Sequence, residues 1–145
     1  MGRLHDIRLK SNAFVANMNV HISQSIESVE KKLVDLNKKQ MLGSVDSDNK
    51  SLIHASTGSI YLSKPYAKRK NKVKPNLFDS GEFQKEMFLQ TNENNNTWFI
   101  DSYSSKSKHL VTNYGSNLFG IFNKVKAKLL TGLAFKRKYE SMVLK

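Results

Sequence analysis

FVANMNVHISQSIESVEKKLVDLNKKQM, residues 14–41, governs the prediction of the fold, because its apolar residues recur in steps of three and four. The recurring residues are Val15, Met18, Ile22, Ile26, Val29, Leu33 and Leu36. This spacing indicates one face of an amphipathic helix, and Gly43 offers a place for it to end, so we predict one long helix over about residues 13–42. At about 1.5 Å per residue the helix would be roughly 40 Å long. We expect it to lie across a sheet, with packing on a neighbouring molecule or a short coiled coil as the alternatives.

The segments after this helix predict an α+β fold in which the helix packs on a small, mostly antiparallel sheet. Residues 51–63 suit either a hairpin or a transition from helix to strand. Residues 63–76 are rich in lysine and poor in apolar residues, which predicts a long, exposed basic loop. A strand hairpin is expected over about residues 82–103, with the asparagine-rich run TNENNNT at its tip.

The C-terminal part, about residues 104–145, is expected to be mainly helical. Ser104 or Ser105 can cap a short helix that ends at Gly115, and a final helix is predicted over about residues 133–144. A chain of this length usually forms one domain, and we therefore expect residues 1–145 to fold as a single domain.

The charge of the chain is large and unevenly placed. Its 145 residues include 24 Lys and Arg against 12 Asp and Glu, which gives a formal net charge of +12. No acid occurs between Asp48 and Asp79 or between Asp101 and Glu140. The basic residues of these stretches are Lys50, Lys64, Lys68, Arg69, Lys70, Lys72 and Lys74, then Lys106, Lys108, Lys124, Lys126, Lys128, Lys136, Arg137 and Lys138. They suggest a surface on one side of the molecule for a polyanion or an acidic partner, with a merely solvated basic surface as the alternative.

The sequence shows no pattern that is typical of catalysis or of a cofactor site. Without cysteine there is no thiolate zinc site, and neither a phosphate-binding glycine loop nor a nucleophile elbow occurs. Asp46 and Asp48 are expected to form a turn rather than a calcium site. The histidines are isolated from one another and are expected to have structural or surface roles: His5, His21, His54 and His109. We therefore expect a non-enzymatic protein with no metal and no cofactor.

The sequence also bears on the compartment. No stretch approaches the roughly 18 consecutive apolar residues of a membrane span, and the N-terminal residues lack the apolar run of a secretory signal. The absence of cysteine fits a chain that is made and kept in a reducing compartment. We therefore expect synthesis in the cytosol and no membrane partner.

Three segments resemble a known family when they are taken together and in this order. They are YAKRK (66–70), LFDSGEFQKEM (77–87) and KSKHLVTNYGSNLFGI (106–121). The combination resembles small virion proteins of tailed bacteriophages that lie at the head-to-tail junction, the neck, connector or tail-completion ring proteins. In that family a segment similar to L-x-x-[ST]-G-x-[FL] opens a strand, and one similar to K-x-x-x-L-x-x-x-Y-G-x-x-[IL]-F-G joins the sheet to the C-terminal helix.

The motif residues also have structural roles that follow from their chemistry. Gly81 would allow a positive backbone angle before the strand, and Phe83 would face the core. Tyr114 would cover the end of the short helix that Gly115 terminates. An apolar cluster that a small core would bury follows, and together with Gly120 it completes the motif: Leu118, Phe119, Ile121 and Phe122.

The resemblance implies a structural virion protein that forms a multi-copy ring, sixfold or twelvefold, between portal and tail and around the DNA channel. Its partners would be further copies of itself, portal or adaptor proteins and tail proteins, with possible non-specific contact to packaged DNA. It would be assembled in the host cytoplasm and located in the neck or tail of the virion. The residues expected to face a partner ring or the channel are Lys64, Lys68, Arg69, Lys70, Lys72, Lys74, Lys124, Lys126, Lys128, Lys136, Arg137 and Lys138.

Two other functions stay open from the residues alone. The basic loop lies close to Tyr61 and Tyr66, so it could contact phosphates and stack a base, as non-specific single-strand binders do. This alternative is a non-specific nucleic-acid-binding protein. An enzyme without a recognisable motif is the third and would require an apolar pocket with converging ionisable groups.

Overall fold

The computed structural model describes residues 2–145, and the long apolar stretch forms three helices in place of the one expected. They are α1 (Gly2–Ala16), α2 (Met18–Glu27) and α3 (Glu30–Leu42). The backbone leaves the helical region at Asn17 and at Val29, with φ of −111° and −114°. Nearby side chains bond back to the preceding turn, Asn17 to the Ala13 carbonyl and a serine pair to the carbonyls of His21 and Ser25. Such bonds compete with the regular ladder and bend helices, which the apolar spacing does not reveal.

The predicted hairpin is present but shorter than expected. Strands β1 (Met87–Asn92) and β2 (Thr97–Ser102) pair antiparallel with Leu89 opposite Ile100, and the asparagine run forms the turn. The prediction of strand from residue 82 was wrong, because Glu82–Lys85 forms the short helix α5. With this two-stranded antiparallel sheet and its helices, the chain has the α+β fold that was predicted.

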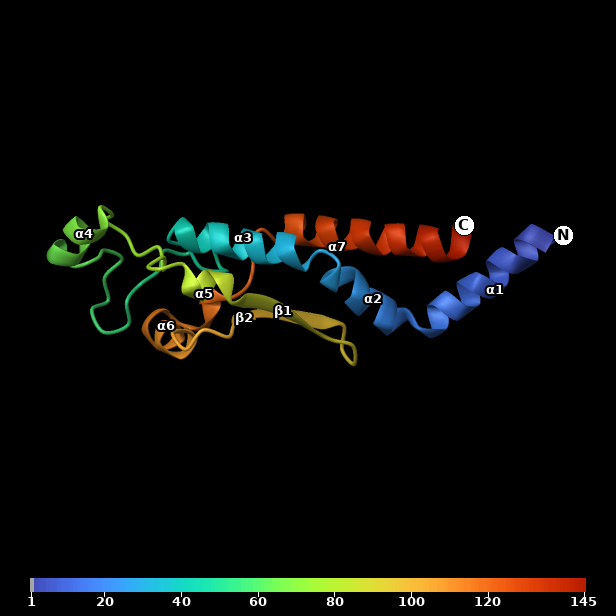
Figure 1. Ribbon diagram of the computed structural model, residues 1–145, viewed down its shortest axis with the longest axis horizontal. Coiled ribbons are helices and arrows are strands. Elements are labelled where there is room, and N and C mark those ends of the chain that lie inside the picture. The colour runs from blue at the N-terminus through green and yellow to red at the C-terminus, as the bar shows by residue number, and fades with distance from the viewer. Residues whose placement is uncertain (1) are drawn as a thin grey trace.

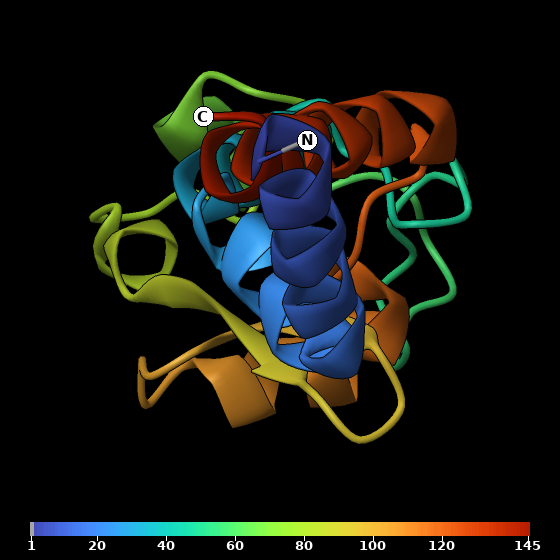
Figure 2. The same cartoon turned by 90° about the vertical axis from the view of Figure 1, so that its right-hand side faces the viewer.

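Helices α2 and α3 pack against β1, and α7 packs against α2. Viewed from the α1 end, α2 lies between α7 and the hairpin (Figure 2). The inward face of the hairpin and the inward face of α3 supply half of the buried core cluster, in agreement with the alternation of side chains along a strand. The core residues include Leu33, Met41, Leu89, Ile100 and Leu118, all of them buried.

The C-terminal helices differ in extent from the prediction. Helix α6 (Ser107–Tyr114) is preceded by Lys106, so neither Ser104 nor Ser105 is the N-cap that was predicted. The Ser104 Oγ atom accepts the N–H of Lys106 and no N–H group of the helix itself. The last helix, α7 (Lys124–Tyr139), begins nine residues before the predicted start and continues into a π-helical turn, Glu140–Leu144. Its first turn is capped by Asn123, whose Oδ1 accepts the Lys126 N–H at 3.0 Å.

The expected basic loop is partly helical, which corrects the prediction for residues 63–76. Helix α4 (Lys64–Lys70) begins with Pro65 in its first turn, where proline fits, and ends at Asn71 with a φ of 51°. Residues 44–63 contain no strand and only two isolated bridges. The turn expected at Asp46 is confirmed, because its Oδ1 accepts the N–H groups of Asp48 and Lys50 at 2.9 Å each.

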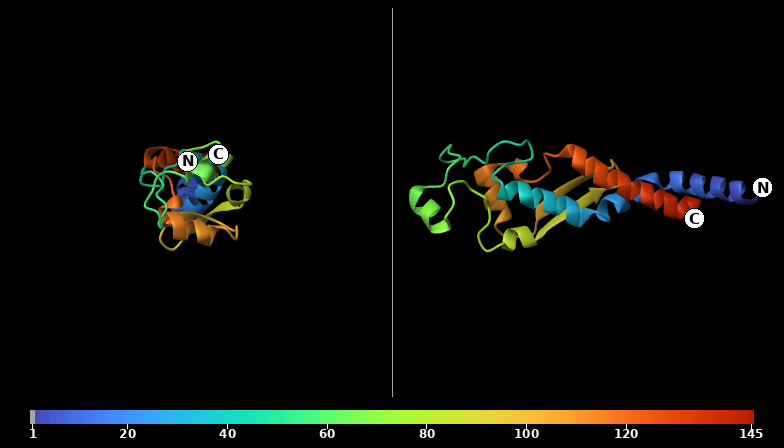
Figure 3. Two further views of the ribbon diagram at one scale, coloured as in Figure 1. Left: turned by 90° about the vertical axis from the view of Figure 1, so that its left-hand side faces the viewer. Right: turned by 90° about the horizontal axis from the view of Figure 1, so that it is seen from above.

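The molecule is elongated (Figure 1). Helix α4 lies at one end and the start of α1 at the other, while α7 begins near the start of α3, runs beside α2 and brings the C-terminus toward the α1 end. The view from above shows α7 beside α2, with most of α3 lying toward the α4 end (Figure 3). Within residues 2–145, no helix has both the length and the apolar character that crossing a lipid bilayer requires.

Candidate interaction surfaces

The three segments that carry the family resemblance meet at one place in the structure. A pocket of about 130 Å³ lies beside α4, and residues from all three segments line it. They include Tyr66 and Lys70 from the first segment, Phe78, Asp79 and Phe83 from the second, and Lys106, Leu110 and Tyr114 from the third. The three segments, which are separate in the sequence, therefore bring α4, α5 and α6 together around this pocket.

Lys70 belongs to this junction rather than to the free basic surface. Its ammonium group pairs with the Asp79 carboxylate, donates to the Phe78 carbonyl at 3.1 Å and lies 5.7 Å from the centre of the Tyr66 ring. The hydrogen bond with Asp79 raises the pKa of Lys70, and the same bond lowers the pKa of Asp79. A second pair joins Lys106 to the Glu82 carboxylate at 3.4 Å. Lys70 thus joins α4 to the segment before α5, and Lys106 joins the segment before α6 to α5.

The motif residues take most of the structural roles that were predicted. Gly81 has a φ of 81° and sits directly under the Phe78 ring, though it precedes α5 and not a strand. Phe83 is buried and its ring lies 5.9 Å from that of Phe119. Tyr114 is packed edge-on against His54, and its burial raises the pKa of its hydroxyl. Gly115 ends α6 as expected.

The apolar cluster after Gly115 is only partly buried. Leu118 and Ile121 are in the core and Phe119 packs against it, but Phe122 is 41 % exposed, so its predicted burial was wrong. Gly120 has a φ of 113°, and a Cβ there would lie 3.1 Å from the Ser47 side chain. The chain turns sharply at this glycine and leads into α7.

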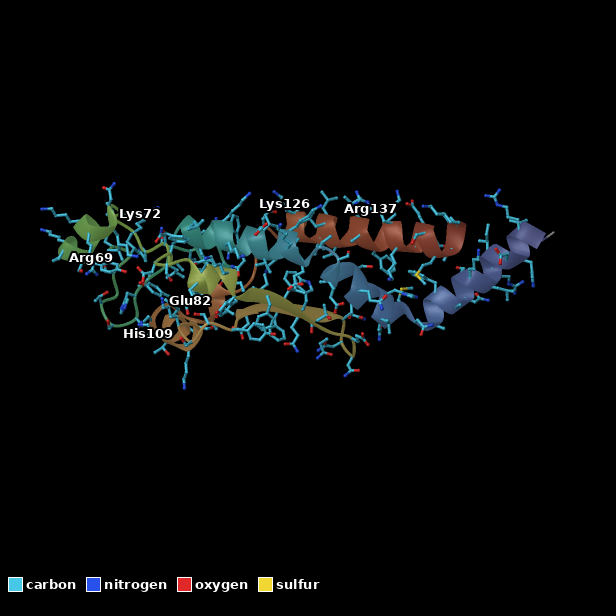
Figure 4. The ribbon with its side chains drawn as sticks, viewed as in Figure 1. Arg69, Lys72, Glu82, His109, Lys126 and Arg137 are labelled. Carbon is cyan, nitrogen blue, oxygen red and sulfur yellow. The ribbon has the colours of Figure 1, made fainter. Side chains whose placement is uncertain are left out.

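The first basic surface, called the basic end, consists of the exposed cations of α4 and the segment after it. Its members are Lys64, Lys68, Arg69, Lys72 and Lys74. No residue of α4 is buried, so the core does not hold this helix in place. Arg69 stacks on Tyr66 at 4.9 Å from the ring centre. Arg69 and Lys72 lie at the tip of the molecule (Figure 4).

The second basic surface, called the α7 face, lies along the side of the molecule. Its cations are Lys124, Lys126, Lys128, Lys136, Arg137 and the half-buried Lys138. Among residues 2–145, only Lys136 in this set has a carboxylate partner, Glu140 at 3.8 Å. Lys126 and Arg137 stand out from the helix on the side away from the hairpin (Figure 4).

An apolar stripe runs between the lysines on the outside of α7. Val125 is 80 % exposed, Leu129 60 % and Leu133 43 %, and the spacing of four residues places them on one line. The inner side of the helix has the small residue Ala127 and the larger Leu130 against the core. Helix α7 is therefore apolar on two sides, and residues 2–145 cover only one of them.

The two basic surfaces do not form the single side that the sequence suggested. The basic end is at the tip beyond α3, whereas the α7 face extends along the flank (Figure 4). A single partner would have to be long to contact both. Residues 64–74 and residues 124–138 therefore form two separate candidate sites.

Comparisons with protein-family models, with curated proteins and with solved structures found no match for this chain. Among residues 2–145, no three histidine, aspartate or glutamate side chains come together in a way that could hold a metal ion.

Two polar residues that the sequence analysis missed position the α7 face. Asn37 of α3 donates to the Leu118 carbonyl at 2.9 Å, and Gln40 donates to the Gly120 carbonyl at 2.8 Å. The Gln40 Oε1 atom also accepts the N–H of Phe122 at 3.1 Å. Both amides are buried on the apolar side of α3. Their position on that side was the available signal, because buried amides need hydrogen-bond partners.

Proposed function

We propose that this protein is a non-enzymatic structural component of a tailed-bacteriophage particle, present as a multi-copy ring at the head-to-tail junction. The observation that supports this proposal best is the outer side of α7, where an apolar stripe lies between free lysines. Exposed apolar surface with a polar border is typical of sites that contact another protein. In a ring, every copy would cover this stripe with its neighbour.

The charge distribution supports a head-to-tail contact between copies. The hairpin and the segment before it carry Glu86 and Glu93, and the hairpin lies on the other side of α2 from α7 (Figure 2). A heterologous contact pairs two different surfaces, so the basic α7 face of one copy can meet an acidic surface of the next. Closure of the ring then adds many weak contacts together.

The basic end supports a contact outside the ring. Its cations project from a helix with no buried residue, so this arm can order against an acidic neighbouring protein or lie against DNA in the channel. Lys70 is excluded from this role because it holds the base of the arm. The ring and the DNA channel in this proposal are inferred from the family resemblance of the sequence alone.

Quantitative mass spectrometry of particles purified from the source tests the proposal. We expect the chain in the particles at a simple ratio to the portal protein. Absence from particles, with recovery on nucleic acid from the lysate, would contradict the structural function and favour non-specific nucleic-acid binding. The unpaired lysines Lys124, Lys126 and Lys128 are the observation in favour of that second function.

A matched pair of variants tests the α7 stripe within the particle. Leu129→Ser removes an exposed leucine from the stripe, and Leu4→Ser removes an exposed leucine from α1. Neither change touches the core, so both variants should fold. We expect Leu129→Ser to reduce incorporation into particles and Leu4→Ser to leave it unchanged. Equal incorporation of the two variants would remove the stripe from the interface.

A further inference from the structure

The two outer edges of the hairpin differ in whether the rest of the chain binds to them. The edge of β1 is closed by carboxylates, because Glu30 accepts the Leu89 N–H at 2.9 Å and Glu27 accepts from the Thr91 hydroxyl at 2.7 Å. These acids come from α2 and α3, which cover β1. No further strand can add to the hairpin on that side.

The edge of β2 has no hydrogen-bond partner within residues 2–145, and it is accessible at Trp98 rather than at Ile100, of which only 3 % is exposed. Backbone groups alternate along an antiparallel strand between the two edges, and the Leu89 N–H points away from β2 toward Glu30. The Tyr103 N–H bonds to the Glu86 carbonyl, so the odd-numbered residues of β2 face β1. Trp98 and Ile100 therefore present their N–H and C=O groups outward. Among residues 2–145, no hydrogen-bond partner meets these four groups.

A groove of about 620 Å³ runs along this open edge, between β2 and the first half of α7. It touches three consecutive residues of β2, 98–100, whose side chains alternate between the faces of the sheet, so the groove follows the edge and not one face. Phe119 and Ile121 form its apolar floor, and Ala127 and Thr131 belong to the α7 wall. Its volume lies within the roughly 300–1,000 Å³ of ligand sites.

The rim of the groove is positively charged. Lys124 and Lys128 line it one helical turn apart, and neither is in an ion pair among residues 2–145. Within the described part of the chain, residues 2–145, no aspartate or glutamate lines the groove. An occupant that carries a carboxylate would therefore meet two free ammonium groups.

We propose that this groove binds an extended acidic segment of a partner protein, which adds a third strand to the hairpin beside β2. The segment would exchange main-chain hydrogen bonds with Trp98 and Ile100, and its alternate side chains would enter the apolar floor. A carboxylate of the segment would lie against Lys124 and Lys128. The inference concerns this groove alone and holds in any assembly, so it does not depend on the proposed function.

A second copy of the chain fits this groove less well than a foreign strand. Its own β1 edge is closed by Glu30, and the pairing of two β2 edges would bring two sets of Lys124 and Lys128 together. Like charges at close range oppose such a contact. An isolated two-stranded hairpin is only marginally stable, so a third strand also stabilises the sheet that receives it.

Selection of random nine-residue peptides displayed on yeast, with the full chain as target, tests the proposal. We expect enriched peptides to alternate apolar and polar residues and to contain an acid. Lys128→Glu should weaken the binding of an enriched peptide by about tenfold or more, the effect of losing one charged contact. Lys126→Glu makes the same change of charge on the same helix, outside the groove, and should leave binding within about twofold.

Amide hydrogen exchange identifies the mode of binding. A bound strand should slow exchange at Trp98, whose N–H group has no partner within residues 2–145 and is only partly buried, and leave Phe99 and Asp101 as they are because β1 already bonds them. The proposal is overturned by a selection without enrichment, by equal effects of the two lysine variants, or by peptide binding without protection at Trp98. Protection of this amide by self-association, detected by light scattering, would assign the groove to a second copy and also overturn it.

Discussion

Residues 64–74 and 124–138 are both rich in lysine, and the structure holds them in different ways. The basic end is attached by contacts at the surface, chiefly the pair between Lys70 and Asp79, and α4 buries no residue. The α7 face is attached by buried amides of α3 that bind the segment leading into α7, and by Ala127 in the core. One cationic surface is therefore a loosely held arm, and the other is part of the rigid body.

The number of lysines in a stretch therefore does not determine how many of them are free to bind a partner. Lys70 and Lys68 are two residues apart, yet only Lys70 has a carboxylate beside it. On α7 the residues between the lysines decide the outcome, because Ala127 faces the core and Val125 faces solvent. The charges of a rigid helix also keep fixed distances, which suits repeated contact with one partner.

The largest effect is expected where the α7 face joins the core. Gln40→Leu keeps the size of the side chain but leaves the Gly120 carbonyl and the Phe122 N–H without their partner. Each orphaned buried group costs about 1–3 kcal/mol, so we expect the free energy of unfolding to fall by about 2–3 kcal/mol. Denaturant unfolding measures this change. Gln24→Leu, at an exposed position of α2, is the control and should have little effect.

A smaller effect is expected on polyanion binding, and it compares the two surfaces directly. Lys124, Lys126 and Lys128 changed together to serine should lower the slope of log K against log salt by about 2–3, since each lost phosphate contact removes about 0.9. The matched triple change of Lys68, Lys72 and Lys74 should lower it by about 1, because a loosely held arm keeps fewer of its lysines on phosphates at one time. Fluorescence anisotropy with a short DNA duplex measures both slopes. A greater loss from the basic end would reverse the comparison.

Local chemistry explains which parts of the fold could be predicted from the sequence. The asparagine turn, the end of α6 at Gly115 and the Asp46 turn follow from residues that are adjacent in the chain. The start of α7 could not be predicted, because Val125 and Leu129 face outward and disturb the apolar period of the helix. A lone apolar stripe in the sequence does not say which side of a helix the core will cover.

The candidate site was predictable in composition but not in arrangement. Both lysine stretches were identified from the sequence. The ion pair with Asp79, which removes Lys70 from the free basic surface, depends on a contact between residues nine apart. The open edge of β2 depends on register and on Glu30, which is 59 residues from Leu89. Such long-range contacts have no signature in a single sequence, whereas Asn37 and Gln40 on an apolar helix side do.

The smallest expected effect concerns the pair that holds the basic end. Lys70 lowers the pKa of Asp79 from its ordinary 3.8, so this carboxylate supports the pair above that pH and ceases to do so as the pH falls through the lowered pKa. Asp79 raises the pKa of Lys70 from 10.5, so the ammonium supports the pair below that pH and is lost only above it. The pair should therefore persist from about pH 4 to about pH 10.

Carboxyl carbon NMR shifts of Asp79 test this expectation. In Lys70→Ser the titration midpoint of Asp79 should rise toward 3.8, and amide exchange should quicken in α4. Lys68→Ser removes a neighbouring lysine that has no contact with Asp79 and should leave the midpoint in place. Because the pair is at the surface, global unfolding should hardly change in either variant. A midpoint that stays lowered without Lys70, or a large loss of global stability, would mean that the basic end is as firmly built into the body as α7 is.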